Sequence, residues 1–253
     1  MVYYAYPISV ALLGVNINSL SNGREETEMS PHLIFEVLYM HKVMVFIDYQ
    51  NFNINLKEYF KNKDKELRSI NYIKLGNAIN ELIPFNSEVI KTFVFAYKPN
   101  DKLMTLESNR KYYEWLTEKL KKTKYLEVIE GRQEIRYYKN TKFDINNPDT
   151  YTTVEKETDI NLATHMVAKG FQNAYDIAIL VSGDTDYTSV IQTLHNIGKI
   201  IVIAHFKHQN ISKYDGIYDA EVILYDDVLK NCVNPKSKNN TEENIDDSSN
   251  EQD

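Results

Sequence analysis

The sequence has one cysteine, no apolar run long enough to span a membrane, and no excess of positive charge. Cys232 alone cannot form an intramolecular disulfide, which excludes a disulfide-stabilised scaffold and suits a reducing compartment. Residues 2–15 are apolar, but they lack a basic leader, are too short for a membrane span, and contain Pro7 and Gly14. We therefore expect a cytoplasmic protein without a membrane anchor.

The formal net charge of −7 excludes a uniformly basic surface. The whole of this imbalance lies at the two ends of the chain. Residues 234–253 hold two lysines against six carboxylates, and residues 1–40 hold one arginine against four glutamates. The stretch between them is close to neutral, so bulk charge neither supports nor excludes binding to nucleic acid.

Composition divides the chain into three parts. Residues 233–253 have few apolar side chains and many carboxylates, which predicts a disordered acidic tail because little surface can be buried. Residues 1–40 precede the first convincing strand, and Met40 and Met44 stand beside its start. We expect these forty residues to be an extension or a misassigned start. The folded domain is expected at 41–232.

Within this domain, short apolar runs alternate with segments of helical spacing. Residues 43–47 form a continuous apolar run, as expected of a parallel strand covered on both faces. Alternating strands and helices predict a single α/β domain with a mostly parallel sheet of about five or six strands, flanked by helices. Further strands are expected at 89–97, 125–130, 176–181, 199–204 and 221–224, and helices at 70–83, 103–122, 159–168 and 187–196.

Residues 131–156 interrupt the alternation. They are rich in threonine, tyrosine and valine, with Asn146, Asn147, Pro148 and Asp149 in the middle. β-Formers on either side of a turn sequence predict a hairpin, so we expect a β-arm here.

Two groups of carboxylates follow expected strands. Asp48 comes directly after the first strand, and Asp184 and Asp186 follow the fourth in a turn that Gly183 permits. In open parallel sheets, ligands bind outside the carboxyl ends of the strands. Converging carboxylates repel one another unless a cation neutralises them, and hard divalent cations prefer such oxygen ligands. Aspartates at two strand ends therefore indicate a metal site.

Each of these residues also has a simpler interpretation. Aspartate is a common helix N-cap, so Asp184 alone can be a capping residue. Asp159 opens the helix before the fourth strand, where it can complement the helix dipole or face the same crevice. Asn51 could orient Asp48, hold a metal-bound water, or serve as a turn residue.

Three motifs occur in order on the expected elements: Asp48-x-x-Asn51, Lys156-x-x-Asp159 and Ser182-Gly183-Asp184-x-Asp186-Tyr187. Together they resemble the NYN domains of the PIN-like nuclease superfamily, which includes the LabA-like proteins, over roughly residues 41–230. The resemblance implies a PIN-like (Rossmannoid) domain. It also implies an acidic site that binds Mg²⁺ or Mn²⁺ and hydrolyses RNA phosphodiester bonds, most simply as an endoribonuclease.

Carried over residue by residue, the resemblance makes four aspartates both catalytic and metal-binding: Asp48, Asp159, Asp184 and Asp186. Asn51 and Ser182 would support them. Many relatives have another aspartate six residues after the one that matches Asp159, where this chain has His165. That histidine could bind metal, transfer a proton, or only cap the crevice, and the departure puts full activity in doubt.

Basic and aromatic residues near the arm are candidates for contact with RNA, including single-stranded RNA. Lysine and arginine meet phosphates, and tyrosine can stack on unpaired bases. An ordinary solvated surface explains the same residues equally well. A homodimer is also consistent with the resemblance. The candidates are Lys121, Lys122, Lys124, Arg132, Arg136 and Tyr138.

Two other functions remain open. A PIN-like module that binds RNA or a protein partner without cleaving anything would fit His165 and the neutral domain. A phosphatase of the haloacid dehalogenase type would use Asp184-x-Asp186 as its nucleophile motif. That motif normally ends the first strand of its fold, whereas here it lies late in the chain.

Overall fold

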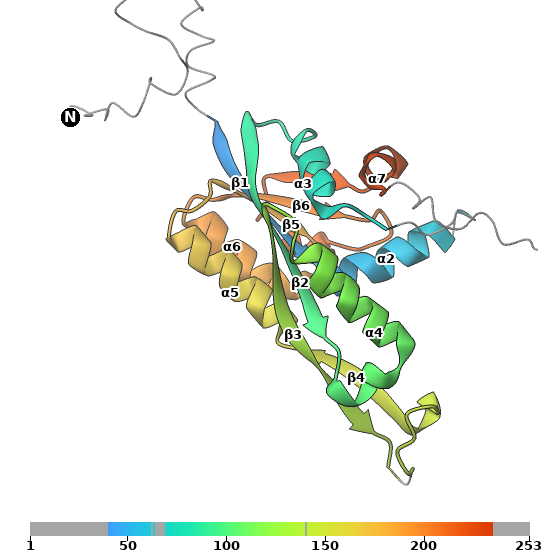
Figure 1. The fold of residues 1–253 in the computed structure, drawn as a ribbon. Coiled ribbons are helices and arrows are strands. Elements are labelled where there is room, and N and C mark those ends of the chain that lie inside the picture. Colours follow the sequence, from blue (N-terminus) through green and yellow to red (C-terminus); the bar gives the residue numbers. More distant parts are fainter. Residues whose placement is uncertain (1–39, 62, 64–68, 140, 235–253) are drawn as a thin grey trace, which may run out of the picture. The chain divides into compact units, whose positions relative to one another are not determined.

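The computed structural model describes residues 40–61, 63, 69–139 and 141–234 (Figure 1). The expected N-terminal extension and acidic tail lie almost entirely outside these residues and stay predictions. Among the described helices, none combines the length and apolar character needed to cross a membrane.

Seven strands form one sheet in the order β4-β3-β2-β1-β5-β6-β7. Neighbouring strands are parallel except β3 and β4, which are antiparallel. This confirms the predicted α/β fold with a mostly parallel sheet. The strands are β1 (His41–Asp48), β2 (Ser87–Lys98), β3 (Leu126–Tyr137), β4 (Tyr151–Lys156), β5 (Ile177–Val181), β6 (Ile200–His205) and β7 (Ala220–Ile223).

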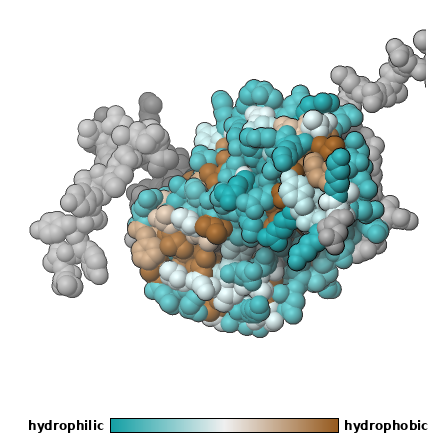
Figure 2. Space-filling model, turned by 90° about the horizontal axis from the view of Figure 1, so that it is seen from below, coloured by the Kyte–Doolittle hydropathy of each residue, from teal (hydrophilic) through white to brown (hydrophobic). Residues whose placement is uncertain are grey.

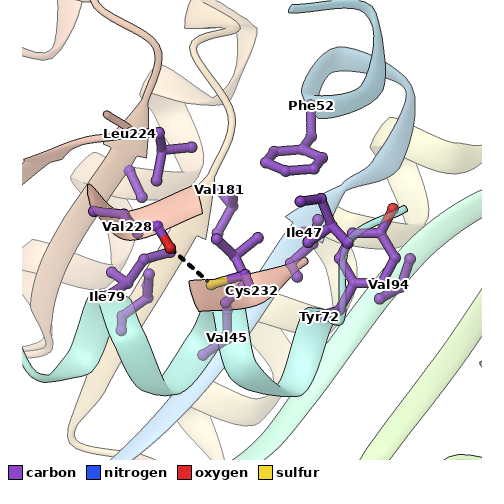
Figure 3. Close-up of a cluster of buried hydrophobic side chains, with 14 of the residues drawn as sticks. Val45, Ile47, Phe52, Tyr72, Ile79, Val94, Val181, Leu224, Val228 and Cys232 are labelled. Atoms are coloured by element: carbon purple, nitrogen blue, oxygen red, sulfur yellow. Dashed lines mark hydrogen bonds between the residues drawn. The ribbon is translucent and has the colours of Figure 1, made fainter. Parts of the chain in front are cut away.

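Helices cover both faces of the sheet, as Figure 1 shows. One layer packs on the buried cluster that includes Val45, Ile47 and Val94, part of which Figure 3 shows with Cys232 inside it. The layer on this face consists of α2 (Tyr49–Lys61), α3 (Tyr72–Asn80), α7 (Asp226–Cys232) and α4 (Glu107–Glu114) with its π-helical extension η4 (Trp115–Leu120). The other face carries α5 (Thr158–Phe171) and α6 (Thr188–Asn196).

The sequence of each central strand explains why it lies inside. All five residues of β5 are buried, and so are the last six residues of β1. A strand with apolar side chains on both faces is stable only between two layers of helices. The last of these β1 residues is Asp48, a carboxylate at the end of an otherwise apolar strand.

The direction in which the chain adds strands reverses next to β1. From β1 the chain adds β2 and then β3 on one side, whereas β5, β6 and β7 are added on the other. Ile47 of β1 pairs with Val181 of β5 at this boundary. Connections leave the sheet in opposite directions there, which opens a crevice at the carboxyl ends of the two strands. Asp48 and the segment after Val181 both lie at this edge.

The arm differs in detail from the expectation. β3 does not end at residue 130 but continues to Tyr137, and β4 pairs antiparallel with its second half from Arg132 to Tyr137. The arm is therefore an extension of the sheet. Between its strands lies the short helix η5 (Pro148–Thr150), for which the side chain of Asn147 is the N-cap.

The helices also differ from the expectation in places. The helix expected at 103–122 is broken into η3 (Asp101–Thr105), α4 and η4. Helix α2 was not predicted, although its buried residues Phe52, Leu56 and Phe60 recur every four residues. α2 begins directly after Asp48, so it helps to position the site.

Candidate active site

Asp48 is fixed by two separate segments of the chain. Its side chain is only 4% exposed. The Asn51 backbone N–H donates to Oδ1 over 3.0 Å, as for a helix N-cap at the start of α2. The Ser182 hydroxyl, directly after β5, donates to Oδ2 over 3.1 Å. Asp48 therefore joins β1 to the loop after β5.

Tyr187 links Asp48 to Asp159. Tyr187 is buried in η6 (Thr185–Tyr187), and its hydroxyl lies 3.2 Å from Asp48 Oδ2 and 3.1 Å from Asp159 Oδ1. Asp159 stands in the first turn of α5 and is exposed. Two of the four predicted aspartates thus meet at one hydroxyl. The sequence motif ended in Tyr187, but only the fold shows that its hydroxyl reaches both carboxylates.

Burial changes the chemistry of Asp48. Desolvation is the main reason that its pKa rises from 3.8 to about 6. The negative charge of Asp159 raises this pKa as well, whereas the hydrogen bonds from Asn51, Ser182 and Tyr187 lower it. The pKa of Tyr187 is also raised, chiefly by burial and then by both aspartates. Asp48 can therefore bind or release a proton near pH 6.

Asp184 acts as a cap, as its simpler interpretation predicts. Its Oδ1 accepts from the Asp186 backbone N–H over 3.0 Å at the start of η6, and its own N–H donates to the Ser182 hydroxyl over 3.1 Å. Its carbonyl oxygen accepts from the hydroxyl of Tyr214. After burial, the charges of Asp184, Asp186 and Asp48 raise the pKa of Tyr214 in that order. All three aspartates are thus close to one tyrosine, with Asp186 exposed at the rim.

Asn51 connects the loops that follow β5 and β6. Its Oδ1 accepts from the Gly183 N–H over 3.2 Å and from Gln209 Nε2 over 2.9 Å. A Cβ atom on Gly183 would lie 2.4 Å from the Gln209 amide and 2.8 Å from its Cβ, so a glycine is needed there. Asn51 therefore positions the site. Gln209 is a supporting residue that the sequence motifs did not indicate.

His165 lies on α5 among sheet residues. Its ring centroid is 5.6 Å from that of Phe95 and 6.3 Å from that of Phe93, and Nδ1 donates to the Asn161 carbonyl over 2.8 Å. Phe95 is the neighbour of Asp48 in the β-sheet register. Packing and one hydrogen bond account for this position, and neither involves the aspartates.

Glu155, on β4, is an acidic residue of this region that the sequence analysis missed. Its pKa is raised from 4.5 to about 7, chiefly by burial and to a smaller extent by the charges of Asp48 and Asp159. The hydroxyl of Thr158 lies nearby and lowers this pKa, but it does not form a hydrogen bond with Glu155. Both carboxylate oxygens of Glu155 are therefore buried without a partner in the described part of the chain. No local pattern marks Glu155, because it reaches the site only through the pairing of β4 with β3.

The donor chemistry suits a divalent cation, although the ligands are not gathered into a closed set. Asp48, Asp159 and Glu155 repel one another, and carboxylate oxygens are the donors that Mg²⁺ and Mn²⁺ prefer. Within the residues that the structure describes, no three histidine, cysteine, aspartate or glutamate side chains are placed to hold a metal ion. The acids therefore fit a cation by charge and by chemical type.

Half of the candidates for RNA contact have acidic partners. These pairs are Lys121 with Glu130, Lys122 with Glu118, and Arg132 with Glu134 and Glu157. A lysine or arginine in such an ion pair can bind a phosphate only after it has released the glutamate. The other three candidates are exposed and form no ion pair with any described residue: Lys124, Arg136 and Tyr138.

The arm offers a second polar surface. An open hollow on it is lined by Asn100, Lys102, Glu134, Ile135 and Tyr137, and Lys102 Nζ donates to the Tyr137 hydroxyl over 3.1 Å. Seen from below, the molecule is mostly hydrophilic, with separate apolar areas (Figure 2). This hollow lies between the arm and the segment that follows β2, and it includes none of the aspartates.

Three comparisons relate the chain to known proteins. The family model described as NYN domain matches residues 42–219. No curated protein matches the sequence. Among solved structures, a protein of unknown function from Vibrio parahaemolyticus is similar, with 14% identity and a TM-score of 0.47, over 75% of this chain and 96% of that one.

Proposed function

The chain belongs to the NYN domain family, within the PIN-like nuclease superfamily, and from this we propose that it is a metal-dependent ribonuclease. NYN domains are generally nucleases that act on RNA, and PIN-like nucleases typically use divalent metals. The proposal adds that the ion is Mg²⁺ or Mn²⁺, that cleavage is endonucleolytic, and that the protein works in the cytoplasm.

The observation that carries the proposal is the hydroxyl of Tyr187 between Asp48 and Asp159. It holds two carboxylates from different elements together in the crevice where the strand order reverses. Desolvation and repulsion from Asp159 raise the pKa of Asp48 to about 6, because the ionised carboxylate is unfavourable in this buried position. Perturbed carboxylates in a crevice are typical of a catalytic site.

Each acid has a role in this proposal. Asp48, Asp159 and Asp184 would hold the ion, with Asp186 at the rim. When bound, the ion would lower the pKa of water and offset the charge on the phosphate. Asp159 is exposed, and the Tyr187 hydroxyl fixes its Oδ1, which leaves Oδ2 to accept a proton from the attacking water.

Two further residues support the acids, and a third packs beside them. Ser182 holds Asp48 and Asn51 holds the Gly183 loop, whereas His165 packs against Phe95, the neighbour of Asp48 in the sheet. The proposed substrate is RNA with unpaired nucleotides, which would contact the exposed residues Lys124, Arg136 and Tyr138. Two chains acting as a homodimer would give a longer RNA surface.

The test is cleavage of a labelled, structured RNA with Mn²⁺, with Mg²⁺ and with EDTA. Asp184→Asn is expected to lower the rate at least about 100-fold. Asp227→Asn is the control because Asp227 is exposed on α7 and, among the described residues, forms its ion pair with Lys230. A circular RNA separates endonucleolytic from exonucleolytic cutting. Metal-independent cutting, or equal rates for wild type and Asp184→Asn, would refute the proposal.

A binding module without cleavage is the second candidate. It is favoured by the hydrogen-bonded state of Asp48 and by the capping role of Asp184, which together leave no closed ligand set among the described residues. RNA binding without metal-dependent cutting would establish it. Nothing in the site favours the phosphatase alternative, because Asp184 follows β5 and caps η6.

A further inference from the structure

Glu155 and Asp159 flank a sharp turn between the arm and the helix layer. β4 ends at Lys156, Glu157 adopts a left-handed conformation with φ of 73°, and α5 begins at Thr158. On the other side, Gly131 of β3 approaches this turn so closely that a Cβ there would lie 2.5 Å from the Lys156 carbonyl oxygen. The turn is therefore held between two strands, and it fixes Glu155 and Asp159 relative to each other.

The surroundings of Glu155 contain acids and tyrosines. Its charge raises the pKa of Tyr49, Tyr97 and Tyr112, in each case after burial, and these tyrosines stand close to one another. The ring centroids of Tyr97 and Tyr112 are 5.1 Å apart, and those of Tyr49 and Tyr112 are 5.8 Å apart. In the described part of the chain, no lysine, arginine or histidine forms an ion pair with Glu155.

A carboxylate in this position is unfavourable for the protein alone. Both oxygens are buried, neither accepts a hydrogen bond from a described residue, and Asp48 and Asp159 add repulsion. A buried charge without a partner destabilises a fold. A cation near Asp48 and Asp159 would remove both penalties, whereas the neutral hydroxyl of nearby Thr158 could offset only part of the first and none of the repulsion.

We infer that Glu155 is a further carboxylate of the cation site, contributed by the β-arm. The inference rests on the proposed function and extends it, because the motifs place the acids only on β1, α5 and the loop after β5. With Glu155 included, the arm becomes part of the site. A divalent cation would then connect the arm to the sheet edge.

The experiment measures Mn²⁺ binding by titration calorimetry, together with thermal melting in EDTA and in Mn²⁺ at pH 8. Glu155→Gln keeps the shape of the side chain and removes its charge. We expect it to weaken Mn²⁺ binding at least tenfold, to raise the melting temperature in EDTA, and to reduce the further rise that Mn²⁺ gives. Glu134→Gln, on the same arm but paired with Arg132, is the matched control and should bind Mn²⁺ like the wild type.

Two further variants keep the outcomes distinct. Asp184→Asn tests the proposed function itself. If Asp184→Asn loses Mn²⁺ while Glu155→Gln binds it unchanged, Glu155 is a buried neutral acid and this inference is wrong, although the proposed function survives. If the wild type binds no Mn²⁺, both fail. Should Glu155→Gln not fold, Glu155→Leu also removes the carboxylate and suits a buried position, and unchanged Mn²⁺ affinity there would equally overturn the inference.

Discussion

The hydroxyl of Tyr187 lies within hydrogen-bond distance of Asp48 and of Asp159, at 3.2 and 3.1 Å. A hydroxyl has only one proton to donate, so it satisfies one ionised carboxylate at a time. The carboxylate oxygen that receives no proton then faces a lone pair of the Tyr187 oxygen, unless its own carboxyl group is protonated. The raised pKa of Asp48, about 6, agrees with this arrangement. The repulsion between Asp48 and Asp159 can therefore be offset either by a proton on one of them or by a bound cation.

Removing this hydroxyl should loosen the pair. Tyr187→Phe is expected to lower the free energy of unfolding by about 1–2 kcal/mol, because buried carboxylate oxygens lose a donor. The pKa of Asp48 should rise further, since the Tyr187 hydrogen bond lowers it. Urea denaturation and NMR titration of the carboxyl carbons measure the two effects. Tyr225→Phe is the control, because Tyr225 is 43% exposed. Equal stability of the two variants would contradict the assigned role of Tyr187.

Stability without divalent metal should fall as the pH rises from about 4 to 7. Burial raises the pKa of Asp48 from 3.8 to about 6, so the folded state binds this proton more tightly than the unfolded state does. The stabilisation is complete below pH 4 and is lost as the pH passes 6. The shift corresponds to on the order of 2–3 kcal/mol.

Urea denaturation in EDTA at several pH values measures this loss. Asp48→Asn cannot ionise and should make the profile less steep, and the slope that remains is expected from Glu155, whose pKa is raised to about 7. The exposed Asp227→Asn should leave the profile unchanged. A profile for wild type that rises from pH 4 to pH 7 would show that other groups outweigh Asp48. Added Mn²⁺ should restore stability at high pH if the acids bind it.

The turn at Glu157 should tolerate glycine better than glutamate. With φ of 73°, a residue with a Cβ costs about 1 kcal/mol, whereas glycine adopts this conformation freely. The exposed ion pair with Arg132, which the change removes, contributes less than about 1 kcal/mol. Glu157→Gly is thus expected to be neutral or stabilising by up to about 1 kcal/mol in thermal melting. Asn173→Gly is the comparison, because asparagine tolerates φ of 54° better, and a clear loss of stability in Glu157→Gly alone would be unexpected.

Gly131 should not tolerate any side chain. A Cβ would lie 2.5 Å from the Lys156 carbonyl oxygen and 2.9 Å from the Thr158 N–H nitrogen, and these backbone atoms cannot rotate away. Gly131→Ala is expected to destabilise the fold by about 2 kcal/mol or more and to displace Asp159 at the start of α5. Gly216→Ala serves as the control, since nothing lies within 4 Å of its Cβ and only its φ of 79° opposes the change. Similar losses for both variants would mean that the arm moves freely.

Much of the fold could be predicted because the central strands are continuous apolar runs that are recognisable in the sequence. A run such as residues 43–47 has no polar face, so it has to lie between two layers, and its end has to reach the edge where ligands bind. That reasoning alone brings Asp48 close to Asp184. Helix α2 carried a usable signal in Phe52, Leu56 and Phe60, but the polar residues between them obscured it.

What could not be predicted depends on pairings between distant segments. Glu155 is an ordinary strand residue until β4 pairs with β3 and carries it to the acids. In the same way, the acidic partners of Lys121 and Arg132 lie on neighbouring elements that local spacing cannot identify. The capping role of Asp184 could be predicted from residue type, whereas the distance between Asp48 and Asp159 depends on Tyr187.

The hydrogen bond between Ser182 and Asp48 joins residues 134 positions apart in the sequence. During synthesis, Asp48 leaves the ribosome long before β5 and Tyr187 have been made. A nascent chain therefore carries an incomplete site until the segment with Ser182 and Tyr187 has been made. The proposed cleavage of RNA, which needs both segments, therefore cannot begin before that point in translation.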